Sequence, residues 1–284
     1  MIHNIGFEKG LFGTKAIIKG PWQDKFLKLF KKLEVQELEL NDGKGWRGDN
    51  LDFLKHLTNL KSVIIIDFSI KSIEAVHFLK ELIKLEISTY SKTPIDFKAF
   101  PELVDCSLEW SNSSESLFEV LSLKKLLINS YNKKSSDNFS KFINLEELSI
   151  LNSQIEDIQG LSKLKNIKAL RLGNLKKLTS LKGLNNLHEL VELEIQKCKG
   201  IFTISEIQKL NKLERLLLLD SGNVPSIKGI EKLANLKDFI FYESTNIVDG
   251  DLTPLTKLSS LKKVSFQNRR HYSHKREDFG QLFA

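Results

Sequence analysis

The fold of this chain is decided by residues 145–164, which read LEELSILNSQIEDIQGLSKL. Leu145, Leu148 and Ile150 form an L-x-x-L-x-L pattern, and the spacing of Leu148 and Ile150 is the two-residue period of a β-strand. Ile155, Ile158, Leu161 and Leu164 then recur at every third position, which favours a turn followed by a short helical or 3₁₀ segment. The stretch therefore predicts one strand followed by one return.

The same apolar triplet occurs eleven times, at an average step of 22.6 residues. Its copies begin at Val35, Leu60, Leu82, Leu103, Leu123, Leu145, Ile167, Leu190, Leu213, Leu236 and Leu261. One strand and one return cannot bury an apolar edge alone, so the units must stack and share a continuous core. We number the positions of each repeat from the first residue of its triplet.

The repeats resemble the leucine-rich repeat family, in its 22-residue form, over about residues 35–267. The resemblance implies an α/β fold, namely a right-handed solenoid (horseshoe) with a concave parallel β-sheet and short helices or 3₁₀ turns on the convex side. The family commonly places Asn at position 9, where it bonds backbone groups of the turn. Here Phe68, Tyr90, Tyr131 and Leu175 occupy that position in four repeats. We therefore expect an irregular turn ladder.

The ends of a solenoid need caps, because an open end exposes core. We assign residues 1–34 to an N-terminal cap, with a strand over 15–19 and an amphipathic helix that carries Trp22, Phe26, Leu29, Phe30 and Leu33 on one face. Residues 35–267 hold the eleven repeats. Residues 268–284, with Phe279, Leu282 and Phe283, form a C-terminal cap or tail. Together they predict one structural domain.

Composition favours a soluble globular protein, since 41% of the 284 residues are hydrophobic and 28% are charged. The longest apolar runs have four residues, so no membrane span and no membrane partner is expected. The N-terminus lacks the apolar core of a signal peptide. Two cysteines, Cys106 and Cys198, are too few for a disulfide framework or a zinc site. These features predict a cytoplasmic protein.

No catalytic arrangement can be assembled from the sequence, so we expect no enzyme activity, no cofactor and no metal. Residues 43–48 do spell G-x-G-x-x-G, the fingerprint of dinucleotide-binding folds. That fingerprint needs a doubly wound sheet, whereas a solenoid carries its returns on one face only. An enlarged glycine-rich turn is the preferred interpretation.

The net charge of +7 and the pI near 9.1 raise nucleic acid as a partner. On a strand, positions 1, 4 and 6 face the core, so positions 3, 5 and 7 form the concave face. These positions carry nine acids, including Glu37 and Glu39, and five bases. The concave face is therefore negative, and we do not expect nucleic acid to bind there.

The concave face also carries apolar side chains in repeats nine and ten. The predicted partner-binding residues are Arg215, Leu217, Leu219, Ile240 and Tyr242, with Glu192, Glu194, Arg171 and Trp110. Aromatic and Arg residues beside aliphatic ones are typical anchors of a protein interface. The competing interpretation is that the aliphatic side chains only pack on one another across adjacent strands.

The sequence thus favours a non-catalytic protein-protein binding module that grips a protein partner, with a basic surface, on its concave face. An inhibitor, a toxin-neutralising immunity protein and an adaptor all fit. One alternative is salt-sensitive binding of nucleic acid or another acidic surface through the basic convex face and the tail with Arg269, Arg270, Lys275 and Arg276. A further alternative is an exported effector that binds a foreign host protein. The oligomeric state is not predicted.

Overall fold

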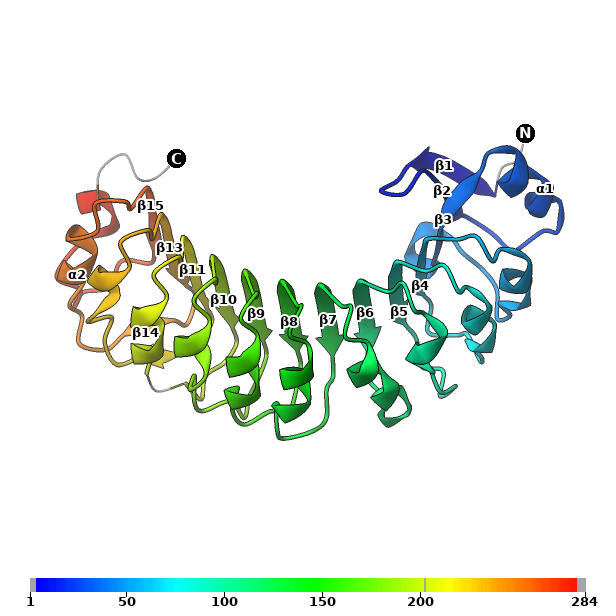
Figure 1. The fold of residues 1–284 in the computed structure, drawn as a ribbon. Helices are drawn as coiled ribbons and strands as arrows, with labels where there is room; N and C mark the ends of the chain where they lie inside the picture. Colours follow the sequence, from blue (N-terminus) through cyan, green and yellow to red (C-terminus); the bar gives the residue numbers. More distant parts are fainter. Residues whose placement is uncertain (1–3, 202, 280–284) are drawn as a thin grey trace. The chain divides into compact units, whose positions relative to one another are not determined.

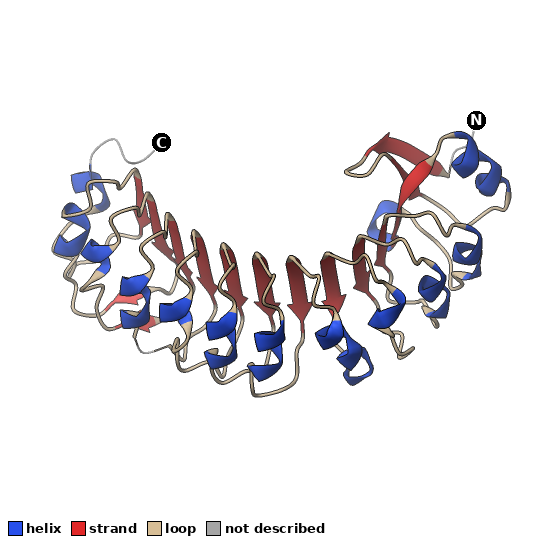
Figure 2. Cartoon of the chain, in the orientation of Figure 1, coloured by secondary structure: helices blue, strands red, loops and turns tan. Residues whose placement is uncertain are grey.

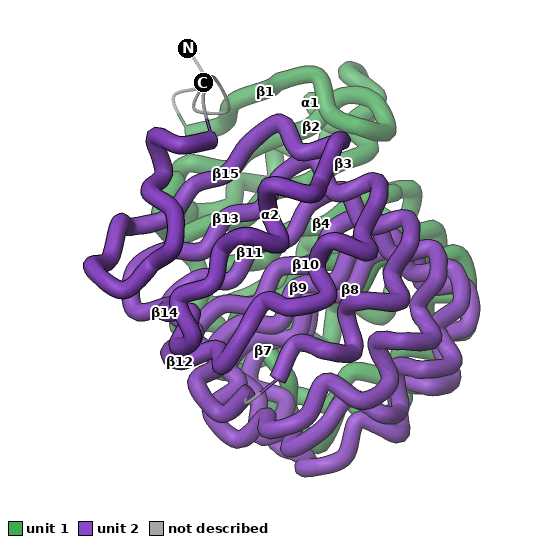
Figure 3. The backbone as a smooth tube through the Cα atoms, turned by 90° about the vertical axis from the view of Figure 1, so that its left-hand side faces the viewer, with its two compact units in different colours: residues 1–126 green, residues 127–284 purple. Residues whose placement is uncertain are grey.

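The structure is a computed structural model that describes residues 4–201 and 203–279 (Figure 1). The chain falls into two compact units, unit 1 with residues 1–126 and unit 2 with residues 127–284 (Figure 3). The assignment of 1–34, 35–267 and 268–284 to cap, repeats and cap stays a prediction.

Unit 1 begins with a β-hairpin and a helix. β1 (Ile5–Lys9) is antiparallel to β2 (Thr14–Ile18), and β2 pairs in parallel with the first repeat strand, β3 (Val35–Asn41). The helix α1 (Lys25–Lys32) follows, and its Phe26 and Phe30 are buried. Trp22, just before it, stacks on Phe53 with ring centroids 3.8 Å apart. The hairpin partner β1 was not expected from the sequence.

The repeats of unit 1 alternate one strand with short 3₁₀ helices. β3 pairs in parallel with β4, β4 with β5, and β5 with β6. The further strands are β4 (Ser62–Ile66), β5 (Lys84–Ser88) and β6 (Asp105–Glu109). The 3₁₀ helices are η1 (Asp42–Lys44), η2 (Asp52–His56), η3 (Glu74–Phe78), η4 (Phe97–Ala99) and η5 (Asn112–Glu119).

Unit 2 has the same alternation, and β7 (Lys125–Asn129) begins just before the unit boundary. Its other sheet strands are β8 (Glu147–Leu151), β9 (Ala169–Gly173), β10 (Glu192–Gln196), β11 (Arg215–Leu219), β13 (Asp238–Tyr242) and β15 (Lys263–Phe266). Successive strands from β8 to β15 in this set pair in parallel. A second, two-stranded sheet joins β12 (Asn223–Val224) to β14 (Asn246–Ile247).

The returns of unit 2 are again short. They are η6 (Asp137–Lys141), η7 (Gln159–Lys163), η8 (Leu184–Asn186), η9 (Ser205–Lys209), η10 (Ile230–Lys232), the α-helix α2 (Thr253–Thr256) and η11 (Arg276–Phe279). In each unit the strands lie on one face and the short helices on the other (Figure 2). The predicted leucine-rich repeat solenoid is therefore confirmed.

The core lies between strands and returns, as the periodicity predicts. Leu145, Leu148 and Ile150 of the quoted repeat are buried, and so are the apolar residues at positions 1, 4 and 6 of the other repeats. Side chains at positions 3, 5 and 7 leave the sheet on the opposite side. We call the surface that they form the sheet face; it is the surface predicted to be concave.

The described C-terminal end is covered by an aromatic cluster. Tyr272 is buried against Phe241 and Phe266, and its hydroxyl accepts a hydrogen bond from the backbone N–H of Ile247 at 3.0 Å. Phe279 lies 6.1 Å from Phe266 between ring centroids. Leu282 and Phe283, also expected in this cap, lie outside the described residues. Tyr272 was not expected to contribute.

No helix in the described part of the chain has both the length and the apolar character needed to cross a bilayer.

Candidate functional site

An apolar patch lies on the sheet face of unit 2, on the adjacent strands β11 and β13. It consists of Leu217, Leu219, Ile240 and Tyr242. The strand register places Leu217 beside Ile240 and Leu219 beside Tyr242. Each of these residues alternates with a buried core residue, so all four side chains leave the sheet on the same side.

The residues of the patch pack on one another and are also partly exposed, so both interpretations from the sequence apply in part. Leu217, Leu219 and Ile240 are half-buried, and Tyr242 is 40% exposed. Neighbouring strands lie about 4.8 Å apart, so the side chains pack against one another at their flanks. Their outer surfaces remain open to solvent, and a partner would bury them further.

Charged residues border the patch, and they are already paired across neighbouring strands. Arg215 lies 3.0 Å from a carboxylate oxygen of Glu192 and 3.3 Å from one of Asp238. Arg171 lies 3.0 Å from Glu194. The two glutamates predicted to select a basic partner thus have arginine partners within the protein. Such exposed ion pairs contribute little to the stability of the fold. A charged side chain of a partner can therefore replace one member of a pair at a small cost in free energy.

A shallow depression of about 350 Å³ lies next to the patch on the same sheet face. It is lined by the charged residues Glu147, Arg171, Glu192 and Glu194 and by the small residues Ser149 and Ala169. Glu194 lies beside Leu217 in the strand register, so depression and patch are continuous.

Trp110 does not belong to this surface, which corrects the prediction from sequence. It lies in unit 1, is only 6% exposed, and packs 5.5 Å from Phe118 between ring centroids. It occupies position 8, directly after β6, where the chain leaves the sheet. Strand alternation does not extend to that position, so it could not reveal that the indole turns inward.

The negative charge predicted for the sheet face is also smaller at its surface than the sequence count suggests. Glu39 is buried between Lys15 and Lys44, each 2.7 Å from one of its carboxylate oxygens. Glu37 is buried and accepts a hydrogen bond from the backbone N–H of Phe12 at 2.5 Å. The hairpin that covers both acids was not expected, so their burial was missed.

The environment of Glu39 also changes its acidity. Burial by itself raises the pKa of this carboxyl, but the ammonium groups of Lys15 and Lys44 outweigh burial and hold the pKa below its usual value. Glu39 is therefore a structural anion that ties the hairpin to the first repeat.

The remaining candidates do not form a reactive centre. Burial raises the pKa of the Cys106 thiol, and it raises that of Cys198 to about 11, so neither thiol is a ready nucleophile. In the described ranges, no group of three His, Cys, Asp or Glu residues could hold a metal ion. Gly45 of the glycine-rich turn has φ +101°, which favours glycine and explains part of the motif structurally.

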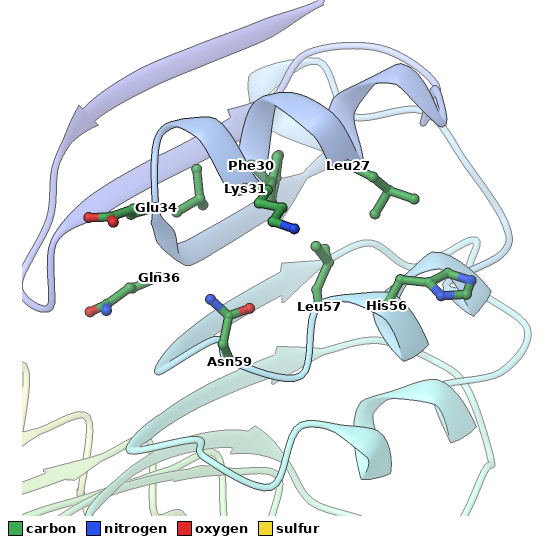
Figure 4. A pocket seen from close by; sticks show the side chains of 9 residues that line it. Leu27, Phe30, Lys31, Glu34, Gln36, His56, Leu57 and Asn59 are labelled. Atoms are coloured by element: carbon green, nitrogen blue, oxygen red, sulfur yellow. The ribbon is translucent and has the colours of Figure 1, made fainter.

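A second depression, of about 690 Å³, lies in unit 1 between α1 and the end of the first repeat (Figure 4). Leu27, Phe30 and Leu57 line it together with His56 and Lys31. Glu34 also lines it, and Figure 4 shows the side chains of Glu34 and His56 pointing away from each other.

Two solved structures show the same fold. Internalin InlF from Listeria monocytogenes has a TM-score of 0.67 and 19% identity over 90% of this chain and 74% of that chain. Internalin C2 from the same bacterium has a TM-score of 0.52 and 20% identity over 75% of this chain and 84% of that chain. No family model and no curated protein matches the sequence.

These similarities, together with the repeats, define the class. The chain has the leucine-rich repeat fold and is structurally similar to internalins. At these identities the likeness concerns the fold. The fold is typically a protein-binding module and is usually non-catalytic.

Proposed function

We propose that this protein is a non-catalytic binding module that holds a protein partner against the apolar patch of unit 2. The observation that carries the proposal is the exposure of Leu217, Leu219, Ile240 and Tyr242 side by side on a sheet face. A contiguous apolar surface bordered by Arg and Tyr has the composition of interface anchors. Burying the remaining exposed surface of each aliphatic side chain contributes up to about 1 kcal/mol.

The charged border supports a basic partner as the finer part of the proposal. Three carboxylates and one guanidinium line the depression beside the patch. A partner Lys or Arg placed there would join the existing pairs of Glu192 and Glu194, which favours orientation more than affinity. An inhibitor, an immunity protein or an adaptor, acting in the cytoplasm, would use this surface in the same way.

The basic tail supports nucleic-acid binding less than its sequence suggests. The guanidinium of Arg269 donates to the backbone carbonyls of Glu243 at 3.1 Å and Thr245 at 3.3 Å. Arg276 lies 3.7 Å from Glu277. Arg269 therefore closes the end of the repeats, and only part of the tail charge remains for phosphate.

The test is affinity capture from a lysate of the native organism with three forms of the protein. The first is the wild type, and the second carries Leu217→Glu with Tyr242→Glu. The third is a matched control, Ile143→Glu with Val248→Glu, which adds the same charge at exposed apolar residues of unit 2 outside the sheet strands. Thermal unfolding checks that all three fold.

We expect one protein to be retained by the wild type and the control at high salt, and to bind the patch variant about 100-fold more weakly. Retention by all three forms would show that the patch is not the binding surface. Release of nucleic acid at low salt from all three forms would instead support the basic tail and returns.

A further inference from the structure

The hairpin of unit 1 presents an open strand edge. β1 pairs with β2 on one side, and no other strand of the described residues pairs with its opposite side. Figure 1 shows β1 at the outer end of the strands of unit 1. Phe7 is 38% exposed and Leu11, in the hairpin loop, is 79% exposed. Exposed strand edges with apolar residues are templates for pairing with another strand.

The hairpin register fixes which backbone groups face outward. The N–H of Lys19 donates to the carbonyl of Asn4, and the N–H of Gly10 donates to that of Gly13. Between them, Gly6 lies opposite Ile17 and Glu8 opposite Lys15. Hydrogen-bonded pairs alternate along an antiparallel ladder, so Gly6 and Glu8 bond toward β2.

It follows that Ile5, Phe7 and Lys9 direct their N–H and C=O groups away from β2. These three residues form an outward ladder that is centred on Phe7. A second strand could bond to all three.

We propose that this ladder pairs antiparallel with the β1 strand of a second copy of this chain, around a two-fold axis at Phe7. In that register Phe7 lies opposite Phe7 of the second copy, and Ile5 lies opposite its Lys9. Every outward N–H and C=O group then finds a partner. A two-fold contact must be self-complementary, and this strand meets that condition.

Charge selects this register over its neighbours. With the axis at Phe7, Glu8 faces Gly6 of the second copy and no like charges stand opposite each other. A shift of the axis to Glu8 would place the two Glu8 carboxylates opposite each other, which is unfavourable. The two exposed Phe7 side chains lie directly opposite each other only in the register centred on Phe7.

The contact is small. A single five-residue strand on each side, even with the Phe7 side chains, buries less area than a stable interface of about 1,600 Å². The dimer is therefore weak and concentration-dependent. Its contact residues belong to unit 1, and none of them is part of the apolar patch of unit 2.

Disulfide trapping tests the register directly, because the native cysteines do not compete with an introduced thiol. Cys106 and Cys198 are both buried. Phe7→Cys places two thiols on the axis with Cα atoms about 5.5 Å apart, which a disulfide can bridge. Lys9→Cys is the matched control on the same strand. Its two copies lie about 14 Å apart and cannot be bridged.

We expect Phe7→Cys to give a covalent dimer under mild oxidation and Lys9→Cys to stay monomeric. Equal crosslinking of both variants, or none of either, would overturn the register. Sedimentation of the wild type between about 5 and 200 µM provides the second measurement, in which self-association should increase with concentration. Phe7→Pro removes an outward N–H and should abolish it. A wild type that is monomeric throughout, or a Phe7→Pro variant that still dimerises, would overturn the proposal.

Discussion

The chain reverses direction after each strand, and the two units form this turn in different ways. In unit 1, a side chain bonds the turn. The Asp67 carboxylate accepts the backbone N–H of Ser69 at 2.7 Å, and the Thr89 hydroxyl accepts that of Ser91 at 3.2 Å. Both residues occupy position 8 of their repeats, and neither has a positive φ. These are turns held by short polar side chains.

In unit 2, the backbone itself turns. Position 8 has a positive φ in six successive repeats, at Ser130, Asn152, Asn174, Lys197, Asp220 and Glu243, with values from 46° to 60°. Asparagine tolerates this conformation well, but lysine and glutamate do not. Asn152 and Asn174 also bond to each other through their side-chain amides at 2.6 Å.

The difference decides where position 9 points. After the positive φ of unit 2, five of the six position 9 residues are buried, namely Tyr131, Ser153, Leu175, Cys198 and Ser221, and Ser244 is exposed. Ser153 and Ser221 donate to backbone carbonyls of neighbouring repeats. In unit 1, Phe68 and Tyr90 at position 9 are exposed, with ring centroids 4.7 Å apart. The expected irregular ladder is thus found in unit 1, whereas unit 2 keeps a regular backbone even around Tyr131 and Leu175.

The largest expected effect tests this comparison by replacing the tyrosine at position 9 in one turn of each unit. Tyr131 is fully buried and packs 5.1 Å from Phe139, while Tyr90 is 75% exposed. We expect Tyr131→Ala to lower the free energy of unfolding by about 3–5 kcal/mol, because it empties a packed site. Tyr90→Ala should change it by less than about 1 kcal/mol. Urea unfolding of the two variants gives both values, and similar losses would contradict the comparison.

The next largest effect concerns the anion that anchors the hairpin in unit 1. Because the folded protein holds the pKa of Glu39 below its usual 4.5, this group stabilises the fold above that pH and the contribution is lost as the pH falls through the lowered value. Lys15 has a raised pKa despite its partial burial, because Glu39 and Glu8 outweigh burial, so its contribution is lost only as alkaline pH passes the raised value.

Glu39→Gln should therefore cost about 1–3 kcal/mol at pH 7 and flatten the decrease in unfolding temperature between pH 5 and pH 3. Glu86→Gln, at the same repeat position two repeats later, is the control and should keep the wild-type pH profile. Unfolding temperatures of the three proteins across that pH range provide the measurement. An unchanged profile in Glu39→Gln would show that the buried anion is not responsible.

The smallest effect has opposite signs in the two units. Lys197→Gly should stabilise the protein by about 0.5–1 kcal/mol, because glycine adopts a positive φ without steric cost. Thr89→Gly should destabilise it by about 1–2 kcal/mol, because the turn loses its side-chain acceptor and the unfolded chain gains freedom. Chemical denaturation of both variants measures the pair. If the two substitutions had the same sign, the two units would not differ in how they form the turn.

Much of the candidate site could be predicted from the sequence, and the misses lie where a strand ends or where another segment contributes. Alternation along a strand placed Leu217, Leu219, Ile240 and Tyr242 correctly on the solvent side of the sheet. It failed for Trp110, which lies one residue past its strand, and for Glu39, which another segment covers. The pairing of Arg215 with Glu192 and Asp238 required the strand register, which a single repeat does not contain.

The amino-acid sequence by itself determined the repeat, its strand and return, and the division of side chains between core and sheet face. It could do so because these properties depend on the spacing of apolar residues within about 22 positions. Only the tertiary structure decided which turn each unit uses, which acids the hairpin buries, and which charges pair across strands. Those outcomes depend on contacts between segments that are distant in the chain, and the local pattern of a repeat carries no record of them.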